Sequence, residues 1–327
     1  MKAIVIEKYG SPDVLQFKEV ERPTPKDNQV LVRVQAASAN PLDWHLMRGE
    51  PFIARLMGTG LLKPKSSRVG ADVAGRVEAV GKDVTLFKPG DEVFGTCNGS
   101  FAEYACARED RLALKPANVS FEEAAAIPVA ATTALQGLRN KGQIQPGQKV
   151  LVNGASGGVG TFAVQIAKSY GTEVTGVCST RNLDLVRKIG ADHVVDYTQE
   201  DFTKNEQQRY DLIFDAVGNR SVSDYKRALK PGGTCAVAGF SSMTRMFEHS
   251  ALGPLRSKTG SKKVGGMGMA KINQNDLVFL KQLVETQKVR PVIDRHYRLS
   301  ETADAIRYLE AGHAQGKVVI TVEHNSK

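Results

Sequence analysis

The stretch that decides the fold runs from residue 150 to residue 160 and reads Val150-Leu151-Val152-Asn153-Gly154-Ala155-Ser156-Gly157-Gly158-Val159-Gly160. Its apolar first part has the composition of a buried strand, and its glycine-rich second part opens an apolar helix that ends near Tyr170. Such a turn lets the backbone approach a pyrophosphate, while the helix N-terminus supplies N–H donors and a partial positive charge. The stretch therefore predicts a dinucleotide-binding βα turn.

Aligned to the GxGxxG pattern, the three key positions are Ala155, Gly157 and Gly160. An ordinary glycine-rich turn is the alternative, but a strand before it and a helix after it are the context that the pattern requires. A P-loop is excluded, because Thr161 follows Gly160 where that motif needs a lysine. The predicted pyrophosphate-binding residues are Ser156, Gly157, Gly158, Val159 and Gly160.

The choice of nicotinamide cofactor depends on the end of the next predicted strand. An NAD enzyme places an acid there for the ribose 2′-hydroxyl, but this strand ends in Ser179, Thr180 and Arg181, with no acid before Asp184. Hydroxyls and a guanidinium suit a 2′-phosphate. We therefore predict NADPH as the cofactor; the alternative reading of Arg181 is a solvent-facing loop residue.

Beyond this turn, strand-like and helix-like segments alternate. Predicted strands are 149–152, 173–178, 193–195, 211–215 and 234–238, and predicted helices are 158–170, 183–189 and 222–229. This alternation indicates βαβ units and a parallel sheet. The fold class is thus α/β, with a Rossmann doubly wound parallel sheet.

The N-terminal third contains short strands separated by turns, which predicts a β-rich module. A helix is expected over 121–140, with Ser120 as its N-cap. Later segments predict a helix over 275–287, a strand over 289–293 and a helix over 300–310. The strand-like 317–322 is expected to return to the N-terminal module. The predicted domains are a discontinuous substrate domain, 1–122 and 289–327, and a nucleotide-binding domain, 123–288.

Composition bounds the class of protein. The 327 residues are 41% hydrophobic, enough for two cores without disulfides, and the four cysteines show no CxxC spacing. We find neither a signal peptide nor an apolar run long enough to span a membrane, so we expect a cytoplasmic protein. The net charge of +9 is mostly dispersed, and the basic stretch 245–271 is rich in glycine and serine. Nucleic-acid binding is therefore not favoured as a main role.

Several motifs together resemble the medium-chain dehydrogenase/reductase superfamily, specifically its zinc-independent quinone oxidoreductase (zeta-crystallin-like) branch. The resemblance covers essentially the whole chain. It rests on Asn40-Pro41-Leu42-Asp43, Gly70-Ala71-Asp72-Val73-Ala74-Gly75, Phe87-Lys88-Pro89-Gly90-Asp91-Glu92-Val93, Phe101-Ala102-Glu103-Tyr104, Ala124-Ala125-Ala126-Ile127-Pro128 and Gly190-Ala191-Asp192. It implies that the substrate domain is GroES-like and that the protein is a homodimer, with contacts near 263–269.

The same alignment predicts that the chain binds no metal. The zinc alcohol dehydrogenases of this family would place a cysteine at Asn40 and a histidine at Ala71, and neither residue present can bind catalytic zinc. Without a Lewis acid, the accessible hydride acceptors are electron-poor, such as quinones or α,β-unsaturated carbonyl compounds. Alternatives are a reductase of other activated alkenes, an NAD(P)-dependent alcohol or aldehyde dehydrogenase, and a non-enzymatic NADPH-binding (crystallin- or RNA-associated) protein.

The resemblance also implies further site residues. Cofactor contacts are expected from Thr133, Tyr197, Val217, Gly218, Gly239, Phe240 and Lys317. For Thr133 the alternative is a helix hydroxyl bonded to its own backbone, for Tyr197 a half-buried strand-end aromatic, and for Lys317 a surface lysine.

On the substrate side, Asn40 is predicted to polarise the nicotinamide or the acceptor, which is a small hydrophobic molecule. Asp43, Trp44 and the apolar segment 48–65 are expected to border the substrate pocket. That segment is either a lid or a locally packed helical excursion. No general acid can be named from the sequence.

Overall fold

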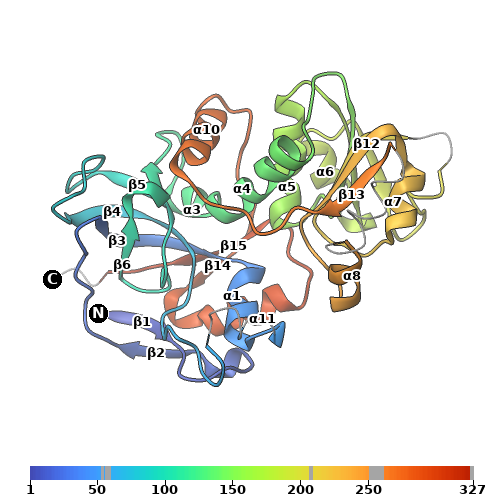
Figure 1. The fold of residues 1–327 in the computed structure, drawn as a ribbon. Coiled ribbons are helices and arrows are strands. Elements are labelled where there is room, and N and C mark those ends of the chain that lie inside the picture. The colour runs from blue at the N-terminus through green and yellow to red at the C-terminus, as the bar shows by residue number, and fades with distance from the viewer. Residues whose placement is uncertain (53–54, 56–59, 206–208, 250–260, 325–327) are drawn as a thin grey trace. The chain divides into compact units, whose positions relative to one another are not determined.

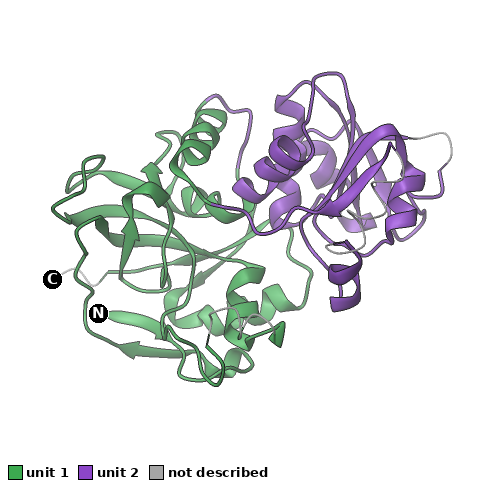
Figure 2. Cartoon of the chain, viewed as in Figure 1, with its two compact units in different colours: residues 1–130, 272–285, 291–327 green, residues 131–271, 286–290 purple. Residues whose placement is uncertain are grey.

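The structure, a computed structural model, describes residues 1–52, 55, 60–205, 209–249 and 261–324 (Figure 1). The chain forms two compact units (Figure 2). Unit 1 comprises residues 1–130, 272–285 and 291–327, and unit 2 comprises residues 131–271 and 286–290. These boundaries differ from the predicted domain boundaries, because 123–130 and 272–285 belong to unit 1 and 289–290 belong to unit 2.

Unit 2 is built on a six-stranded sheet in which every strand pair is parallel. Its spatial order is β10-β9-β8-β11-β12-β13, which is the order 3-2-1-4-5-6 of dinucleotide-binding sheets. The predicted Rossmann fold is therefore confirmed. The strands are β8 (Lys149–Asn153), β9 (Glu173–Cys178), β10 (His193–Asp196), β11 (Tyr210–Asp215), β12 (Leu229–Val237) and β13 (Lys263–Gly266).

Helices connect these strands. They are α5 (Gly158–Ser169), α6 (Leu183–Lys188), α7 (Val222–Ala228) and the short α8 (Met243–Phe247). Figure 1 shows α5 and α7 on opposite sides of β12 and β13. Completely buried apolar side chains, such as Leu151 and Ile213, fill the space between sheet and helices. The carboxyl ends of β8 and β11, where the strand order reverses, thus form the ligand-binding edge of this fold.

Unit 1 contains a mixed seven-stranded sheet of order β14-β15-β3-β4-β5-β7, with β6 paired to β3, and a separate β1–β2 pair. The C-terminal strand β15 pairs antiparallel with β3, which confirms that the tail returns to the N-terminal module. The strands are β1 (Lys2–Val5), β2 (Gln16–Glu19), β3 (Gln29–Ala39), β4 (Asp72–Val80), β5 (Glu92–Thr96), β6 (Tyr104–Arg108), β7 (Leu112–Leu114), β14 (Ile293–Arg298) and β15 (Lys317–Thr321). The helices of this unit include α1 (Pro41–Arg48), α3 (Phe121–Ala125), α10 (Gln274–Glu285) and α11 (Thr302–Glu310).

Two predicted elements are wrong. The single helix over 121–140 is broken into α3, α4 (Pro128–Gln136) and a π-helical turn over 137–141, because Pro128 lacks the N–H that would continue α3. Ser120 does cap α3, with its hydroxyl accepting from the Glu123 N–H. The strand expected over 289–293 begins only at Ile293, since Pro291 cannot donate to a sheet ladder.

Candidate active site

The glycine-rich turn of unit 2 is built for close backbone approach. Gly154 has φ +78°, and a Cβ on Gly160 would lie 1.9 Å from the Gly154 carbonyl oxygen, so only glycine fits there. A Cβ on Gly157, the N-cap of α5, would meet only that same oxygen, at 3.5 Å. Gly157 has no side chain that could cap the helix, so no N-cap side chain bonds the first N–H groups of α5. This cradle fits the pyrophosphate of a dinucleotide.

Two predicted cofactor residues, Ser156 and Ser179, are connected by Asn182. The Asn182 side-chain amide donates to the Ser156 Oγ at 3.0 Å and to the Ser179 Oγ at 3.1 Å. Since each serine oxygen accepts from Asn182, each hydroxyl proton can still be donated to an anion. Sequence reasoning missed Asn182, which is only 5% exposed and whose buried Oδ1 has no hydrogen-bond partner among the described residues.

A carboxylate adjoins the predicted 2′-phosphate site. The Thr180 Oγ1 donates to Asp196 Oδ2 at 2.5 Å, while Thr198 donates its N–H and hydroxyl to Asp196 Oδ1. These hydrogen bonds lower the pKa of Asp196, so it is ionised at neutral pH. Arg181 is exposed beside this turn, and Tyr197, which follows Asp196, is 56% exposed rather than half-buried. The absence of an acid at the end of β9 is thus accompanied by an acid at the end of β10.

The ligand-binding edge of the sheet carries a second polar cluster that the sequence did not indicate. Asp215 ends β11, is completely buried, and accepts from the Val217 and Gly218 N–H groups at 2.7 Å each. Its other oxygen accepts from the Asn153 amide at 3.0 Å and from the Tyr225 hydroxyl. Burial next to Asp215 raises the pKa of Tyr225, which therefore stays protonated and donates. The carboxylate orients the predicted cofactor turn at 217–218.

The remaining predicted cofactor residues of unit 2 lie as follows. A Cβ on Gly218 would lie 2.1 Å from the Gly239 carbonyl oxygen, so these two predicted turns pack together backbone to backbone. Phe240 packs against the core of the sheet and stacks with His249 at 6.1 Å between ring centroids. Thr133 is half-buried on α4.

In unit 1, Lys317 and Asn40 belong to a buried network. The Lys317 ammonium, on a residue only 3% exposed, donates to Asn40 Oδ1 at 2.5 Å, Asp72 Oδ2 at 3.3 Å and the Ala39 carbonyl at 3.4 Å. The Asn40 amide donates to Asp72 at 2.8 Å. The surface-lysine interpretation is wrong. Because every N–H of the Lys317 ammonium has a protein acceptor, a cofactor contact by Lys317 would need this network to open.

The network continues through Asp72 and leaves Asn40 few free groups. Asp72 is completely buried and also accepts from the Ser38 hydroxyl at 2.6 Å and the Val129 N–H at 2.9 Å. Both polar groups of the Asn40 side chain are therefore engaged within the protein. This geometry favours a structural role for Asn40 over the predicted polarisation of substrate.

Asp43 is the third residue of α1 and lies next to this network. Its Oδ2 accepts from the Asn40 N–H at 2.7 Å, which closes a capping box at the helix start. Burial, reinforced by the nearby Asp72 charge and opposed by that hydrogen bond and by Lys317, raises the pKa of Asp43 to about 7. An appreciable fraction of this carboxyl is therefore protonated at neutral pH.

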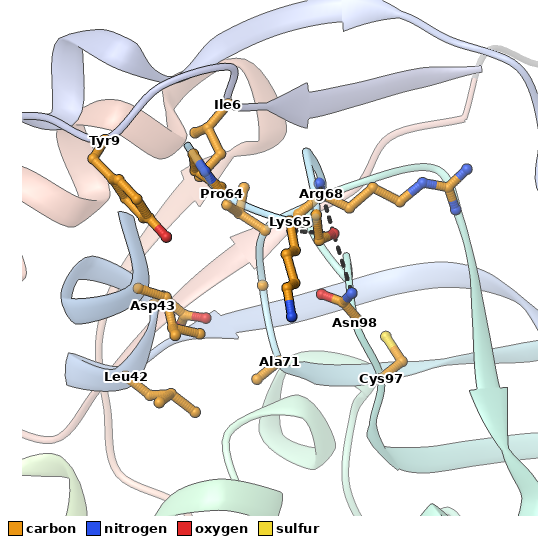
Figure 3. Close-up of a pocket in the computed structure, with 14 residues that line it drawn as sticks. Ile6, Tyr9, Leu42, Asp43, Pro64, Lys65, Arg68, Ala71, Cys97 and Asn98 are labelled. Atoms are coloured by element: carbon orange, nitrogen blue, oxygen red, sulfur yellow. Dashed lines mark hydrogen bonds between the residues drawn. The ribbon is translucent and has the colours of Figure 1, made fainter. Parts of the chain in front are cut away.

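A cavity of about 310 Å³ in unit 1 is lined by some of the predicted substrate-side residues (Figure 3). Asp43 and Lys65, the last residue of the 48–65 segment, line it. Tyr9, Arg68, Ala71, Cys97 and Asn98 were not expected from the sequence as a group. Trp44 packs instead against the core of unit 1. The volume is within the range of small-molecule pockets.

Comparisons with known proteins agree with this architecture. Residues 26–117 match the family described as "Alcohol dehydrogenase GroES-like domain", and residues 189–320 match the one described as "Zinc-binding dehydrogenase". A 2-methylene-furan-3-one reductase of Solanum lycopersicum is 35% identical, covering 98% of this chain and 79% of that protein. The chain belongs to the medium-chain dehydrogenase/reductase superfamily, in its quinone oxidoreductase branch.

Other members of the superfamily support the same assignment. A chloroplastic quinone-oxidoreductase homolog of Spinacia oleracea is 35% identical, with 98% of each chain covered. The solved quinone oxidoreductase from Coxiella burnetii superposes with a TM-score of 0.86 at 33% identity, with 99% of each chain covered. The protein is therefore an oxidoreductase with a Rossmann and a GroES-like domain.

The name of the matched dehydrogenase family raises the question of zinc. Among the described residues, no three His, Cys, Asp or Glu side chains are grouped so that they could hold a metal ion. At the two ligand positions of the zinc enzymes, Asn40 is bonded to Lys317 and Asp72, and Ala71 lies in the cavity wall.

Two predicted segments are described only in part. In the 48–65 segment, Ile53, Leu56 and Met57 lie outside the described residues, and Phe52, Leu61 and Leu62 are exposed. In the basic stretch, 250–260 also lie outside them. Within the described part of the chain, no helix has the length and apolar character needed to cross a membrane.

Proposed function

We propose that the protein reduces α,β-unsaturated carbonyl compounds or quinones with NADPH, by hydride transfer that needs no zinc. The observation that carries the proposal is a dinucleotide cradle in a chain whose zinc-ligand positions are Asn40 and Ala71. In the zinc enzymes of this superfamily a Lewis acid polarises the oxygen of a saturated alcohol or aldehyde, whereas a conjugated acceptor is already electron-poor at its β-carbon. The names of the Solanum lycopersicum and Spinacia oleracea relatives point to the same acceptors.

The residues proposed to hold the cofactor start with the α5 N-terminus, Ser156 and Ser179. The two serine hydroxyls and the exposed Arg181 favour a 2′-phosphate, while the ionised Asp196 opposes it. Both Asp196 oxygens already accept hydrogen bonds from threonine groups, so we expect the attraction of the 2′-phosphate by Arg181 and the serines to exceed its repulsion by Asp196. Thr133, Tyr197, Val217, Gly218, Gly239 and Phe240 remain proposed contacts of the nicotinamide or adenosine halves. An Arabidopsis thaliana relative is named an NADPH-dependent alkenal/one oxidoreductase.

The test is the loss of NADPH absorbance with a panel of quinones, enones, enals and saturated aldehydes, repeated with NADH. We expect turnover of conjugated acceptors, with NADPH preferred over NADH. The rate should be undiminished after chelator treatment, and metal analysis should find no zinc. Turnover restricted to saturated aldehydes or alcohols would overturn the acceptor class, and preference for NADH would overturn the cofactor. Bound NADPH without turnover of any acceptor would favour a non-enzymatic role.

We also propose a homodimer and a cytoplasmic location. The edge strand β13 of the unit 2 sheet and the 80% exposed Met269 support the dimer, which sedimentation analysis tests. The location stays a prediction, since several relatives are named as chloroplastic or mitochondrial proteins.

A further inference from the structure

The reduction proposed above needs a proton as well as a hydride, and the unit 1 cavity contains a group suited to deliver it. Figure 3 shows the Asp43 carboxyl, the Lys65 amine and the Tyr9 hydroxyl directed into this cavity. Resting on the proposed function, we propose that Asp43 is the general acid that protonates the α-carbon of an α,β-unsaturated carbonyl acceptor, and that Lys65 holds the acceptor's carbonyl oxygen.

The other groups that line the cavity are poor proton donors. The Tyr9 hydroxyl already donates to the Gly60 carbonyl at 2.7 Å. Burial raises the pKa of the Cys97 thiol far above neutrality, which makes it a weak acid. Asn98 donates its amide to the Ser66 hydroxyl oxygen at 3.1 Å and carries no acidic proton. Asp43 is the carboxyl in the cavity wall, and it lies on the first turn of α1, held in place by its own capping box.

The environment of Asp43 keeps a proton available. Asp72 on β4 and Lys317 on β15 face it from the buried network. Lys65 points into the cavity, whereas the Arg68 guanidinium is directed away from it (Figure 3). Burial and Asp72 raise its pKa to about 7, the range in which a general acid is most effective near neutral pH. Only Oδ2 accepts the Asn40 N–H, so the second oxygen can carry the proton.

Lys65 supplies the complementary charge. Its ammonium has no hydrogen bond or ion pair with any other described residue and points into the cavity beside Asp43 and Asn98 (Figure 3). A cation there stabilises the negative charge that develops on the acceptor's oxygen.

The β-carbon of the acceptor receives the hydride, with NADPH oxidised to NADP⁺, and the π electron pair of the C=C bond moves to give an enolate whose oxygen faces Lys65. The Asp43 O–H bond then breaks, a C–H bond forms at the α-carbon, and the carboxylate regains a proton from water. A quinone, which takes its proton on oxygen, needs this group less, so the site favours enones and enals.

The decisive variant is Asp43→Asn, because asparagine retains an oxygen that can accept the Asn40 N–H but lacks the acidic proton. The matched control is Asp83→Asn, at an exposed aspartate of the same unit. We expect Asp43→Asn to lower kcat with 3-methyl-3-penten-2-one by about 10²- to 10⁴-fold. In deuterium oxide, wild-type product should carry deuterium on one face of the α-carbon, and the variant product on both faces. Lys65→Gln should lower kcat/KM about tenfold and retain the one-face product.

A readout without turnover checks the acid itself. In cofactor-free protein, the infrared carbonyl band of a protonated carboxyl should titrate near pH 7 in wild type and in Asp83→Asn, and should be missing in Asp43→Asn. If the wild type reduces enones and the Asp43→Asn variant keeps both the wild-type rate and the one-face product, the assignment of Asp43 as general acid is overturned, while the proposed function stands. Silence of the wild type on every enone would instead overturn the proposed function, and the assignment with it.

Discussion

Replacing Lys317 with methionine should destabilise unit 1 strongly, because it leaves the Asp72 carboxylate buried without its cation. The two charged groups are 3.3 Å apart, and their side chains are 3% and 0% exposed. With an effective dielectric constant of about 20, their Coulomb attraction is about 5 kcal/mol. Removing one partner of a buried pair costs about 3–5 kcal/mol. Asp72 keeps its hydrogen bonds from Ser38, Asn40 and Val129, so we expect the unfolding free energy to fall by about 3 kcal/mol, the lower end of this range.

Urea unfolding followed by tryptophan fluorescence measures this effect in the correct unit. Trp44 is the single tryptophan of the chain and packs against the core of unit 1. The matched control is Lys18→Met, which removes an ion pair of 2.9 Å that is open to solvent and should barely move the midpoint. A restored midpoint in the double variant Lys317→Met/Asp72→Asn would assign the loss to the unpaired charge. Equal midpoint shifts for Lys317→Met and Lys18→Met would refute the reasoning.

Three further predictions follow from the described contacts. Arg181→Ala should lower the ratio of kcat/KM for NADPH over NADH about tenfold, and Asp196→Asn should raise that ratio; unchanged ratios would contradict the assigned 2′-phosphate site. Gly160→Ala should lower the melting temperature, since its Cβ would overlap a backbone oxygen, whereas Gly157→Ala should fold normally and lose NADPH affinity by calorimetry. Because folding raises the pKa of Asp43 to about 7, the folded chain binds more protons than the unfolded chain between about pH 4 and pH 7, so the stability of the wild type falls as pH rises through this window. The unfolding free energy of Asp43→Asn should therefore rise by about 2–4 kcal/mol relative to that of the wild type across the same window. A difference between the two unfolding free energies that does not change with pH would contradict the raised pKa.

The features that the sequence predicted are those encoded in short segments. The glycine-rich turn between β8 and α5 and the cap at Ser120 depend on residues within a few positions of one another. The return of β15 to β3 was predictable because a strand-like tail followed the last helix. The prediction of one helix over 121–140 was wrong at Pro128. The apolar helical periodicity continued through this residue, but proline interrupts the backbone hydrogen bonds of the helix.

The unpredicted parts of the site depend on strand pairing between distant segments. Asp196 meets Thr180 because β10 lies beside β9, and this register places Asp196 level with Cys178. Lys317 meets Asp72, 245 positions away, because β15 and β4 both flank β3. Register is fixed by how whole faces are buried, so single-sequence patterns carry little information about which polar residues meet across a sheet.

The buried network bears on how this branch can work without zinc. Lys317 puts an ammonium 2.5 Å from Asn40 Oδ1, at the position where the zinc enzymes of the family have a metal-binding cysteine. That ammonium does not replace the metal as an electrophile, because it is 3% exposed and its N–H groups already have acceptors. Its effect is to neutralise Asp72 and to limit the rise in the pKa of Asp43. Polarisation of an acceptor in the unit 1 cavity therefore falls to a side chain that reaches the cavity with an unpaired charge, and among the described residues Lys65 meets that requirement.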